Sequence, residues 1–221
     1  MKKIIEIAIS LLLLTISYTV SAQEWHFGGS VGYENTGLIW KQGSVAIDID
    51  NVSGFNIGVL AEYDIRDYIG FESGVFFTMT GYQSTGDIVY KDIVIAMATE
   101  KTSLYYLMFP VYAVAKIPIG DFSINFEAGP NLFAGLSGKT TITSKTPLTE
   151  KEYVMRDIFE NTLDRFNCSI HIAAGIQYMG ARLMAGYNFG VYNMYAKELK
   201  QADLGNVINS RGFVISLGYL F

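Results

Sequence analysis

Charge, proline and cysteine are all scarce in this chain of 221 residues. Only 17% of the residues are charged and the formal net charge is −5, which excludes a basic surface for binding nucleic acid. With only four prolines and a hydrophobic share of 50%, the chain is too apolar to be disordered. The single cysteine, Cys168, cannot form an internal disulfide, and we expect it to be a small buried hydrophobic residue.

Long hydrophobic runs are absent after residue 22, so no transmembrane helix is expected there. The one long apolar run, residues 4–20, follows two lysines and ends in small residues. This arrangement predicts a cleaved signal peptide over residues 1–22 and a single domain over residues 23–221. An N-terminal membrane anchor is the alternative, but Glu6 interrupts the run.

Alternation of apolar residues with small or polar residues dominates the rest of the chain. In the first such segment, Trp25, Phe27 and Val31 share one parity, and His26 and Ser30 share the other. A period of two predicts a β-strand with two different faces. Seven alternating segments and one more continuously apolar segment give eight predicted strands: 25–34, 55–64, 69–79, 104–117, 122–129, 168–177, 182–189 and 212–221.

The connections between these strands alternate between short and long. The tight turns are 65–67, 118–121 and 179–181, and the long connections lie near 35–52, 82–101, 137–165 and 192–210. A transmembrane barrel has this asymmetry, with short periplasmic turns and long extracellular loops. We therefore predict an all-β fold, an eight-stranded antiparallel up-and-down transmembrane β-barrel.

A soluble eight-stranded barrel that binds a ligand is the structural alternative, with an apolar interior and a polar exterior. Here the large apolar residues share one face, and a narrow barrel has no room for so many aromatic rings inside. The pattern therefore indicates a lipid-facing exterior. Tyrosines near the predicted strand ends fit interfacial girdles. These are Tyr63, Tyr68, Tyr178, Tyr187 and Tyr219.

The last strand alternates up to a terminal phenylalanine. This ending resembles the signal that bacterial outer-membrane barrels present to their assembly machinery. It implies that the barrel-assembly machinery is a partner and that outer-membrane lipid surrounds the mature protein. The residues of the signal are Phe213, Ile215, Leu217, Tyr219 and Phe221.

Four segments resemble, in order and spacing, strands of a known family. They are Tyr106-Leu107-Met108-Phe109-Pro110-Val111 with Lys116, Glu127-Ala128-Gly129-Pro130, residues 183–191 (LMAGYNFGV) and residues 216–221 (SLGYLF). The chain resembles the outer membrane protein β-barrel domain family, of the PorT-like kind and similar in architecture to OmpA-type barrels. The resemblance implies the outer membrane of a Gram-negative bacterium. It also implies a structural or accessory role in a cell-surface secretion or uptake assembly.

Two positions depart from the pattern of that family. Met108 stands where the family commonly has Glu, and Gly186 stands where it commonly has Arg. The resemblance therefore implies that a pair of charges inside the barrel has been replaced. Both positions fall on the predicted inward parity, so losing them together leaves no buried charge unpaired.

Ionisable residues on the inward parity form the candidate site. Because an eight-stranded barrel is just wide enough for side chains to fill, we expect a charge-paired network that plugs the lumen. The alternative is a narrow, porin-like channel that selects cations and is lined by three glutamates. The residues are Glu62, Glu72, Lys116, Glu127, His171 and Arg182.

Enzyme chemistry has little support in the sequence. After the signal peptide the histidines are His26 and His171, and no metal-ligand cluster, phosphate-binding loop or dinucleotide motif is visible. Ser169 and His171 share a face of one strand, which keeps a lipid-modifying hydrolase as a further alternative. That face is predicted to point inward, away from lipid. We predict no enzymatic activity, no cofactor and no metal site.

The third long loop holds a candidate interaction element. Thr149 and Glu152 match a helix capping box, and four apolar residues follow at near-helical spacing, which predicts an amphipathic helix. Its apolar side either covers the barrel mouth as a lid or docks a partner from a surface complex or a surface glycan. In the second long loop, residues 88–96 indicate that two strands extend above the membrane. The apolar residues of the candidate helix are Met155, Phe159, Leu163 and Phe166.

Overall fold

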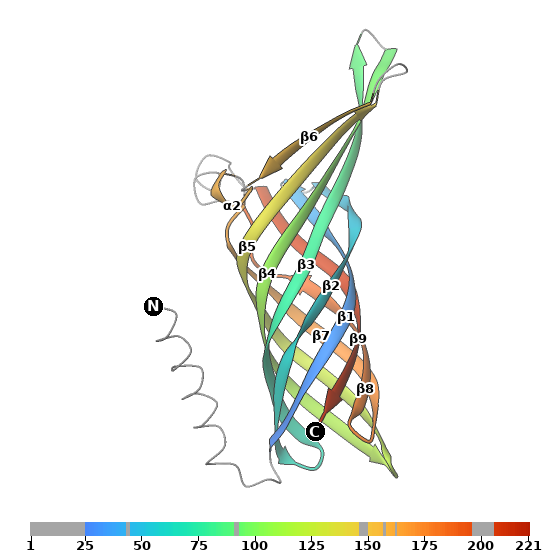
Figure 1. Cartoon of the computed structure of the whole chain (residues 1–221), viewed down its shortest axis with the longest axis vertical. Coiled ribbons are helices and arrows are strands. Elements are labelled where there is room, and N and C mark those ends of the chain that lie inside the picture. The colour runs from blue at the N-terminus through green and yellow to red at the C-terminus, as the bar shows by residue number, and fades with distance from the viewer. Residues whose placement is uncertain are drawn as a thin grey trace, which may run out of the picture.

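The protein is a closed barrel of antiparallel strands (Figure 1). The computed structural model describes residues 25–42, 45–90, 93–145, 150–156, 158–161, 163–195 and 206–221. The predicted signal peptide, residues 1–22, lies outside these described residues. Among the helices within them, none has the length and apolarity to cross a membrane.

Nine strands and one short helix make up the described part of the chain. They are β1 (Trp25–Gln42), β2 (Val45–Arg66), β3 (Ile69–Tyr90), β4 (Ile93–Ile119), β5 (Phe122–Lys145), β6 (Glu150–Arg156), α2 (Ile158–Asn161), β7 (Phe166–Tyr178), β8 (Ala181–Gly190) and β9 (Asn206–Leu220). The strands pair in the order β4-β3-β2-β1-β9-β8-β7-β5, and β4 also pairs with β5 to close a ring of eight. β6 lies outside the ring and pairs with the far half of β5. The predicted eight-stranded antiparallel barrel is confirmed.

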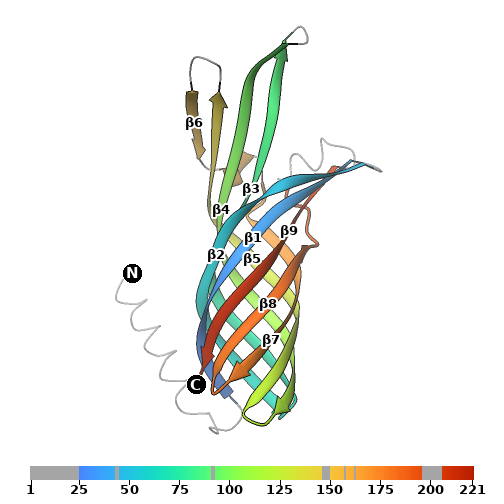
Figure 2. The same ribbon diagram turned by 90° about the vertical axis from the view of Figure 1, so that its right-hand side faces the viewer.

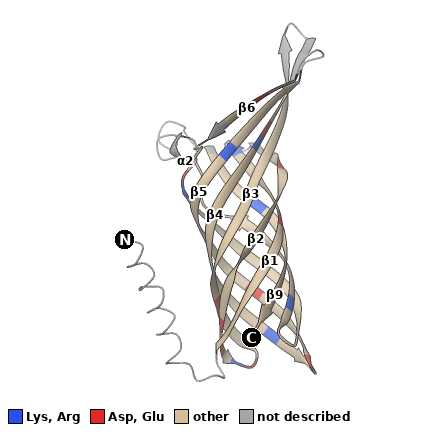
Figure 3. Ribbon diagram, viewed as in Figure 1, with Lys and Arg blue, Asp and Glu red and all other residues tan. Residues whose placement is uncertain are grey.

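The alternation of the sequence becomes the two faces of the barrel wall. In β2, Ile57 and Val59 are 53% and 64% exposed, whereas Asn56 and Leu60, which flank them in the sequence, are buried. The wall is mostly uncharged (Figure 3). An outer surface covered by large aliphatic and aromatic side chains indicates contact with lipid.

Two belts of aromatic rings border this apolar face. In the belt near the termini, the ring centroids of Trp25–Tyr63, Phe122–Tyr178 and Tyr219–Phe221 are 4.9, 4.4 and 5.0 Å apart. In the opposite belt, the pairs Phe55–Phe77, Phe77–Tyr105 and Tyr33–Phe213 have centroids 6.1, 6.1 and 6.0 Å apart. Tyr187 joins this second belt through Phe189, and Tyr68 is exposed in the turn between β2 and β3.

The separation of the belts fits a bilayer. From Phe213 to Phe221 in and just after β9 there are 221 − 213 = 8 residue steps. At about 3.4 Å per residue and a tilt of about 40°, these steps rise about 21 Å along the barrel axis. The apolar band of an outer-membrane barrel is about 25 Å tall.

Strands β3, β4 and β5 continue far beyond the second aromatic belt (Figure 2). β4 has 27 residues, whereas a strand that only crosses a bilayer needs about 9–11. β3 and β4 stay paired up to Tyr90 and Ile93, and β4 and β5 up to Met97 and Lys145. We call β6 and the protruding parts of β3, β4 and β5 the extended sheet. The predicted strand extension at residues 88–96 is confirmed.

The predicted amphipathic helix after Thr149 is wrong. Glu152 and Met155 lie in strand β6, and only the short helix α2 follows it. In β6, Tyr153 pairs with Ile142 and Val154 with Thr141, so this segment completes the sheet beside β5. Pairing with an existing strand edge overrides the helical spacing of the sequence, because aromatic and β-branched residues fit a sheet surface.

Cys168 is not the buried residue that the sequence predicts. Its side chain is partly exposed on the outward face of β7, which it shares with Phe166 and Ile170, exposed at 44% and 39%. The face that contacts lipid is as apolar as a protein core, so sequence periodicity alone does not distinguish lipid contact from burial.

The position of the membrane predicts how charged substitutions behave on the outer face. Leu217 lies midway between the aromatic belts and is 58% exposed. Leu217→Arg should lower the free energy of unfolding by about 2–4 kcal/mol, and Tyr219→Arg, near the interface, by about 0–1 kcal/mol. Urea titration of protein refolded into phospholipid vesicles, followed by heat-dependent gel mobility, measures both. Equal costs at the two positions would contradict this placement.

Candidate lumenal site

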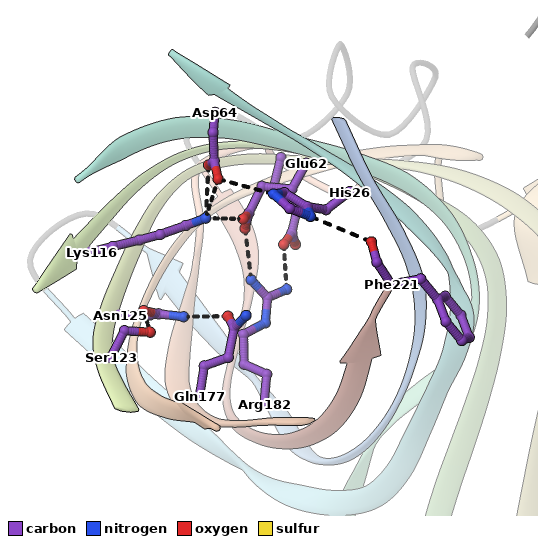
Figure 4. Close-up of polar contacts among 10 residues, drawn as sticks. His26, Glu62, Asp64, Lys116, Ser123, Asn125, Gln177, Arg182 and Phe221 are labelled. Carbon is purple, nitrogen blue, oxygen red and sulfur yellow. Dashed lines mark hydrogen bonds and ion pairs between the residues drawn. The ribbon is translucent and has the colours of Figure 1, made fainter. Parts of the chain in front are cut away.

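An ion-paired network crosses the barrel interior near the end that holds the termini (Figure 4). Arg182 of β8 donates through Nη1 to Glu62 Oε2 at 3.0 Å and through Nη2 to Glu72 Oε2. The two glutamates lie opposite each other on β2 and β3, and all three side chains are buried. One guanidinium therefore bridges two adjacent carboxylates that would otherwise repel each other.

Lys116 of β4 extends this network on the other side of Glu62. Its Nζ lies 2.5 Å from Glu62 Oε1 and 2.7 Å from Asp64 Oδ1. His26 Nε2 lies 3.3 Å from Asp64 Oδ2. We call Glu62, Glu72, Lys116 and Arg182 the lumenal plug. Its side chains reach from β2, β3 and β4 across to β8, so together they close this part of the lumen.

The positions of these groups follow from strand parity and from small neighbours. Arg182 lies opposite Gly218 of β9, which adds no side chain, and opposite Gln177 of β7. Gln177 Oε1 accepts a hydrogen bond of 2.9 Å from Asn125 Nδ2 (Figure 4). Gln177 and Asn125 thus bind each other, and the guanidinium of Arg182 binds the carboxylates of Glu62 and Glu72.

A further buried carboxyl, that of Glu34 in β1, lies farther from the termini than the lumenal plug. Asn56 Nδ2 donates to Glu34 Oε1 at 2.7 Å, and Thr78 Oγ1 donates to Glu34 Oε2 at 3.3 Å. Neutral donors from β2 and β3 therefore satisfy both oxygens of Glu34. Glu34 and Asp64 are not among the predicted site residues, because each lies at the end of a predicted strand. Their position on the inward parity is the feature of the sequence that identifies them as lumenal residues.

His171 belongs to a separate cluster of neutral polar groups. Its Nδ1 donates to Asn188 Oδ1 at 2.8 Å, and its ring stacks on Tyr112 with centroids 4.8 Å apart. Tyr112 OH donates to Asn131 Oδ1 at 2.6 Å, and Asn131 Nδ2 donates to Asn188 Oδ1 at 3.1 Å. Ser169 Oγ is buried and has no hydrogen-bond partner among the described residues. His171 and Ser169 are therefore not joined as a base and a nucleophile.

Two small cavities lie inside the barrel beside these polar groups. The larger, about 50 Å³, is lined by Glu34, Glu72, Glu127 and His171, and the smaller, about 20 Å³, includes Tyr106 and Ser169. Glu127 Oε2, Ser169 Oγ and the Tyr106 hydroxyl are buried without a hydrogen-bond partner in the described residues. Since one water needs about 10–15 Å³, the cavities have room for about three water molecules and one.

The two departures from the family pattern meet at the larger cavity. Met108 and Gly186 both line it. A Cβ atom added to Gly186 would lie 2.8 Å from Cε1 of His171, so the histidine ring fills the space beside this glycine. The replaced positions thus lie in one region of the lumen, and His171 occupies part of the volume there.

All six predicted site residues point into the lumen, but they form two groups. Glu62, Glu72, Lys116 and Arg182 make the plug, whereas Glu127 and His171 lie at the larger cavity. Across the ranges that the structure describes, no group of three or more His, Cys, Asp or Glu side chains is placed to hold a metal ion.

Comparison with known proteins identifies the family. The family model described as "Outer membrane protein beta-barrel domain" matches residues 20–196. The chain belongs to this family. It is therefore an integral protein of the bacterial outer membrane, with its short turns in the periplasm and its extended sheet outside.

Solved outer-membrane barrels are similar to this chain at low sequence identity. The attachment invasion locus protein Ail of Yersinia pestis is 15% identical, with a TM-score of 0.41 over 90% of this chain and 100% of that one. Neisserial surface protein A is 11% identical, with a TM-score of 0.40 over 87% and 97%. The protease OmpT of Escherichia coli is 10% identical, with a TM-score of 0.38 over 93% and 100%. No curated protein sequence matches the chain.

The lumenal plug predicts a large cost for removing its arginine. Arg182→Met leaves Glu62 and Glu72 buried without their shared guanidinium and should lower the free energy of unfolding by about 3–5 kcal/mol. Adding Glu72→Gln to this variant should restore part of the loss, because it removes one of the two stranded charges. Urea titration in phospholipid vesicles measures both. A cost below about 1 kcal/mol for Arg182→Met would contradict a structural role for the network.

Proposed function

We propose that this protein is a non-conducting outer-membrane anchor whose extended sheet docks a protein partner, as an accessory subunit of a cell-surface secretion or uptake assembly. One combination of features supports this proposal: the lumen is filled by paired side chains, while strands β3 to β6 protrude far beyond the membrane. A barrel that transports a solute needs an open path, whereas an anchor needs only a stable wall.

A lid over the outer mouth of the barrel adds to this support. Phe159 of α2 and Leu163 are buried, and the Phe159 ring lies 5.4 Å from that of Tyr106 in the lumen. Leu163 forms a bridge with Tyr195, which ties the segment to the residues that follow β8. Phe166 instead faces outward at the start of β7. Of the apolar residues of the predicted helix, Phe159 and Leu163 therefore belong to the lid, Phe166 belongs to the barrel wall, and Met155 lies in β6.

The extended sheet offers the partner an edge. β6 is the last strand in the order of the sheet beside β5. Tyr153 and Val154 point to opposite faces of β6 and are 57% and 45% exposed. Exposed sheet edges bind partners by adding a strand, and aromatic residues are frequent anchors at interfaces. Docking at β6 is therefore the form of partner binding that this surface favours.

Affinity purification from outer membranes in mild detergent tests this proposal. We expect a stoichiometric partner with the wild-type protein and at least a tenfold loss, about 1.4 kcal/mol or more, with Tyr153→Glu plus Val154→Glu. These substitutions lie in β6 and leave the lid residues unchanged. Thr85→Glu plus Thr99→Glu, in the paired strands β3 and β4, is the matched control and should retain the partner. Purification of the wild-type barrel alone would contradict the accessory role.

A further inference from the structure

Two lysines on the outward face of the extended sheet have no partner within the described part of the chain. Lys101 of β4 lies opposite Thr141 of β5, and Lys139 of β5 lies opposite Ser103 of β4. Both lysines are exposed, and neither forms an ion pair or a hydrogen bond with a described residue. We propose that they bind the phosphate group of a lipid in the outer leaflet and so hold the base of the extended sheet at the membrane surface. This role is independent of partner docking at β6.

The spacing of the two lysines suits a single phosphate. The pairing places Lys101 and Lys139 diagonally across neighbouring strands on one face, and such positions lie about 7–8 Å apart. Their flexible four-carbon side chains can bring both ammonium groups to one anion. Like charges this close repel each other, so an anion between them removes an unfavourable interaction. The residues directly opposite the two lysines on β3 to β6 include no acid; they are Gln83, Ser103, Thr141 and Arg156.

The pair lies at headgroup depth. Tyr105 contacts Phe77 in the second aromatic belt, and such belts mark the boundary between hydrocarbon and headgroups. Lys139 pairs with Ser103, two residues beyond Tyr105, and Lys101 is four residues beyond it. Along tilted strands these steps rise about 5 and 10 Å, and the polar region of one leaflet is about 5–7 Å thick. Lys139 therefore lies among the headgroups and Lys101 just outside them, where its long side chain can turn toward a phosphate.

The surface below the pair favours a lipid over a soluble anion. Toward the membrane, the outward face of β4 and β5 continues through Leu136, Leu132 and Phe109, all exposed. Leu132 and Phe109 lie opposite each other, so they present adjacent apolar side chains. Acyl chains attached to a bound phosphate would cover this surface, whereas a soluble phosphate would gain only the contacts with the two lysines.

Binding of lipid A to the intact protein in detergent micelles, measured by native mass spectrometry, tests the proposal. Wild-type protein should bind phosphorylated lipid A at least about tenfold more tightly than lipid A from which phosphate has been removed. Lys101→Gln plus Lys139→Gln should lose about the same factor, because it removes both ammonium groups. Glucosamine 1-phosphate, which has the phosphate but no acyl chains, should compete weakly.

Lys41→Gln plus Arg66→Gln is the matched control. It removes the same total charge from exposed positions on β1 and β2, outside the lysine pair, so it should change affinity by less than about twofold. Heat-dependent gel mobility checks that both double variants are folded.

Three outcomes would overturn the proposal. An equal loss in both double variants would show diffuse attraction to charge. Equal affinity for lipid A with and without phosphate would show that the phosphate is not recognised, and strong competition by glucosamine 1-phosphate would show a site for soluble anions. The comparison of lipids uses wild-type protein alone, so it holds even if a variant fails to fold.

Discussion

The guanidinium of Arg182 between Glu62 and Glu72 is the interaction on which the closed lumen depends. Two buried carboxylates side by side are unfavourable unless a cation lies between them, and removing one member of such a set is far more costly than omitting all of it. Lys116 binds the other oxygen of Glu62. Because strands β2, β3, β4 and β8 each contribute one member, the network also joins opposite walls of the barrel.

The outer face contacts lipid in place of water between the aromatic belts, so its side chains have to be apolar. The barrel therefore has its apolar side chains outside and its charges inside, and the lumen has to satisfy every polar group within a narrow space. Asn56 and Thr78 satisfy Glu34, whereas Glu127, Ser169 and Tyr106 line cavities large enough for water and each have an oxygen without a hydrogen-bond partner in the described part of the chain.

The period-two alternation was sufficient to predict the eight strands, their inward and outward faces and all six lumenal residues. It could not predict which of those residues meet, because Arg182 and Glu62 are far apart in sequence and their contact depends on the closure of the ring. The near-helical spacing of apolar residues was misleading for residues 150–156, where the free edge of β5 decides between strand and helix. Cys168 was misplaced because a lipid-facing position and a core position have the same hydrophobicity.

The central claim is that this barrel anchors an extracellular surface and does not conduct. Recording single-channel currents from purified wild-type protein in a planar lipid bilayer tests it most directly, with refolding checked on the same sample by heat-dependent gel mobility. The account predicts no uniform conductance steps at moderate voltage in potassium chloride. Reproducible steps of one size with selectivity for cations would contradict it and would establish a narrow channel lined by the lumenal glutamates.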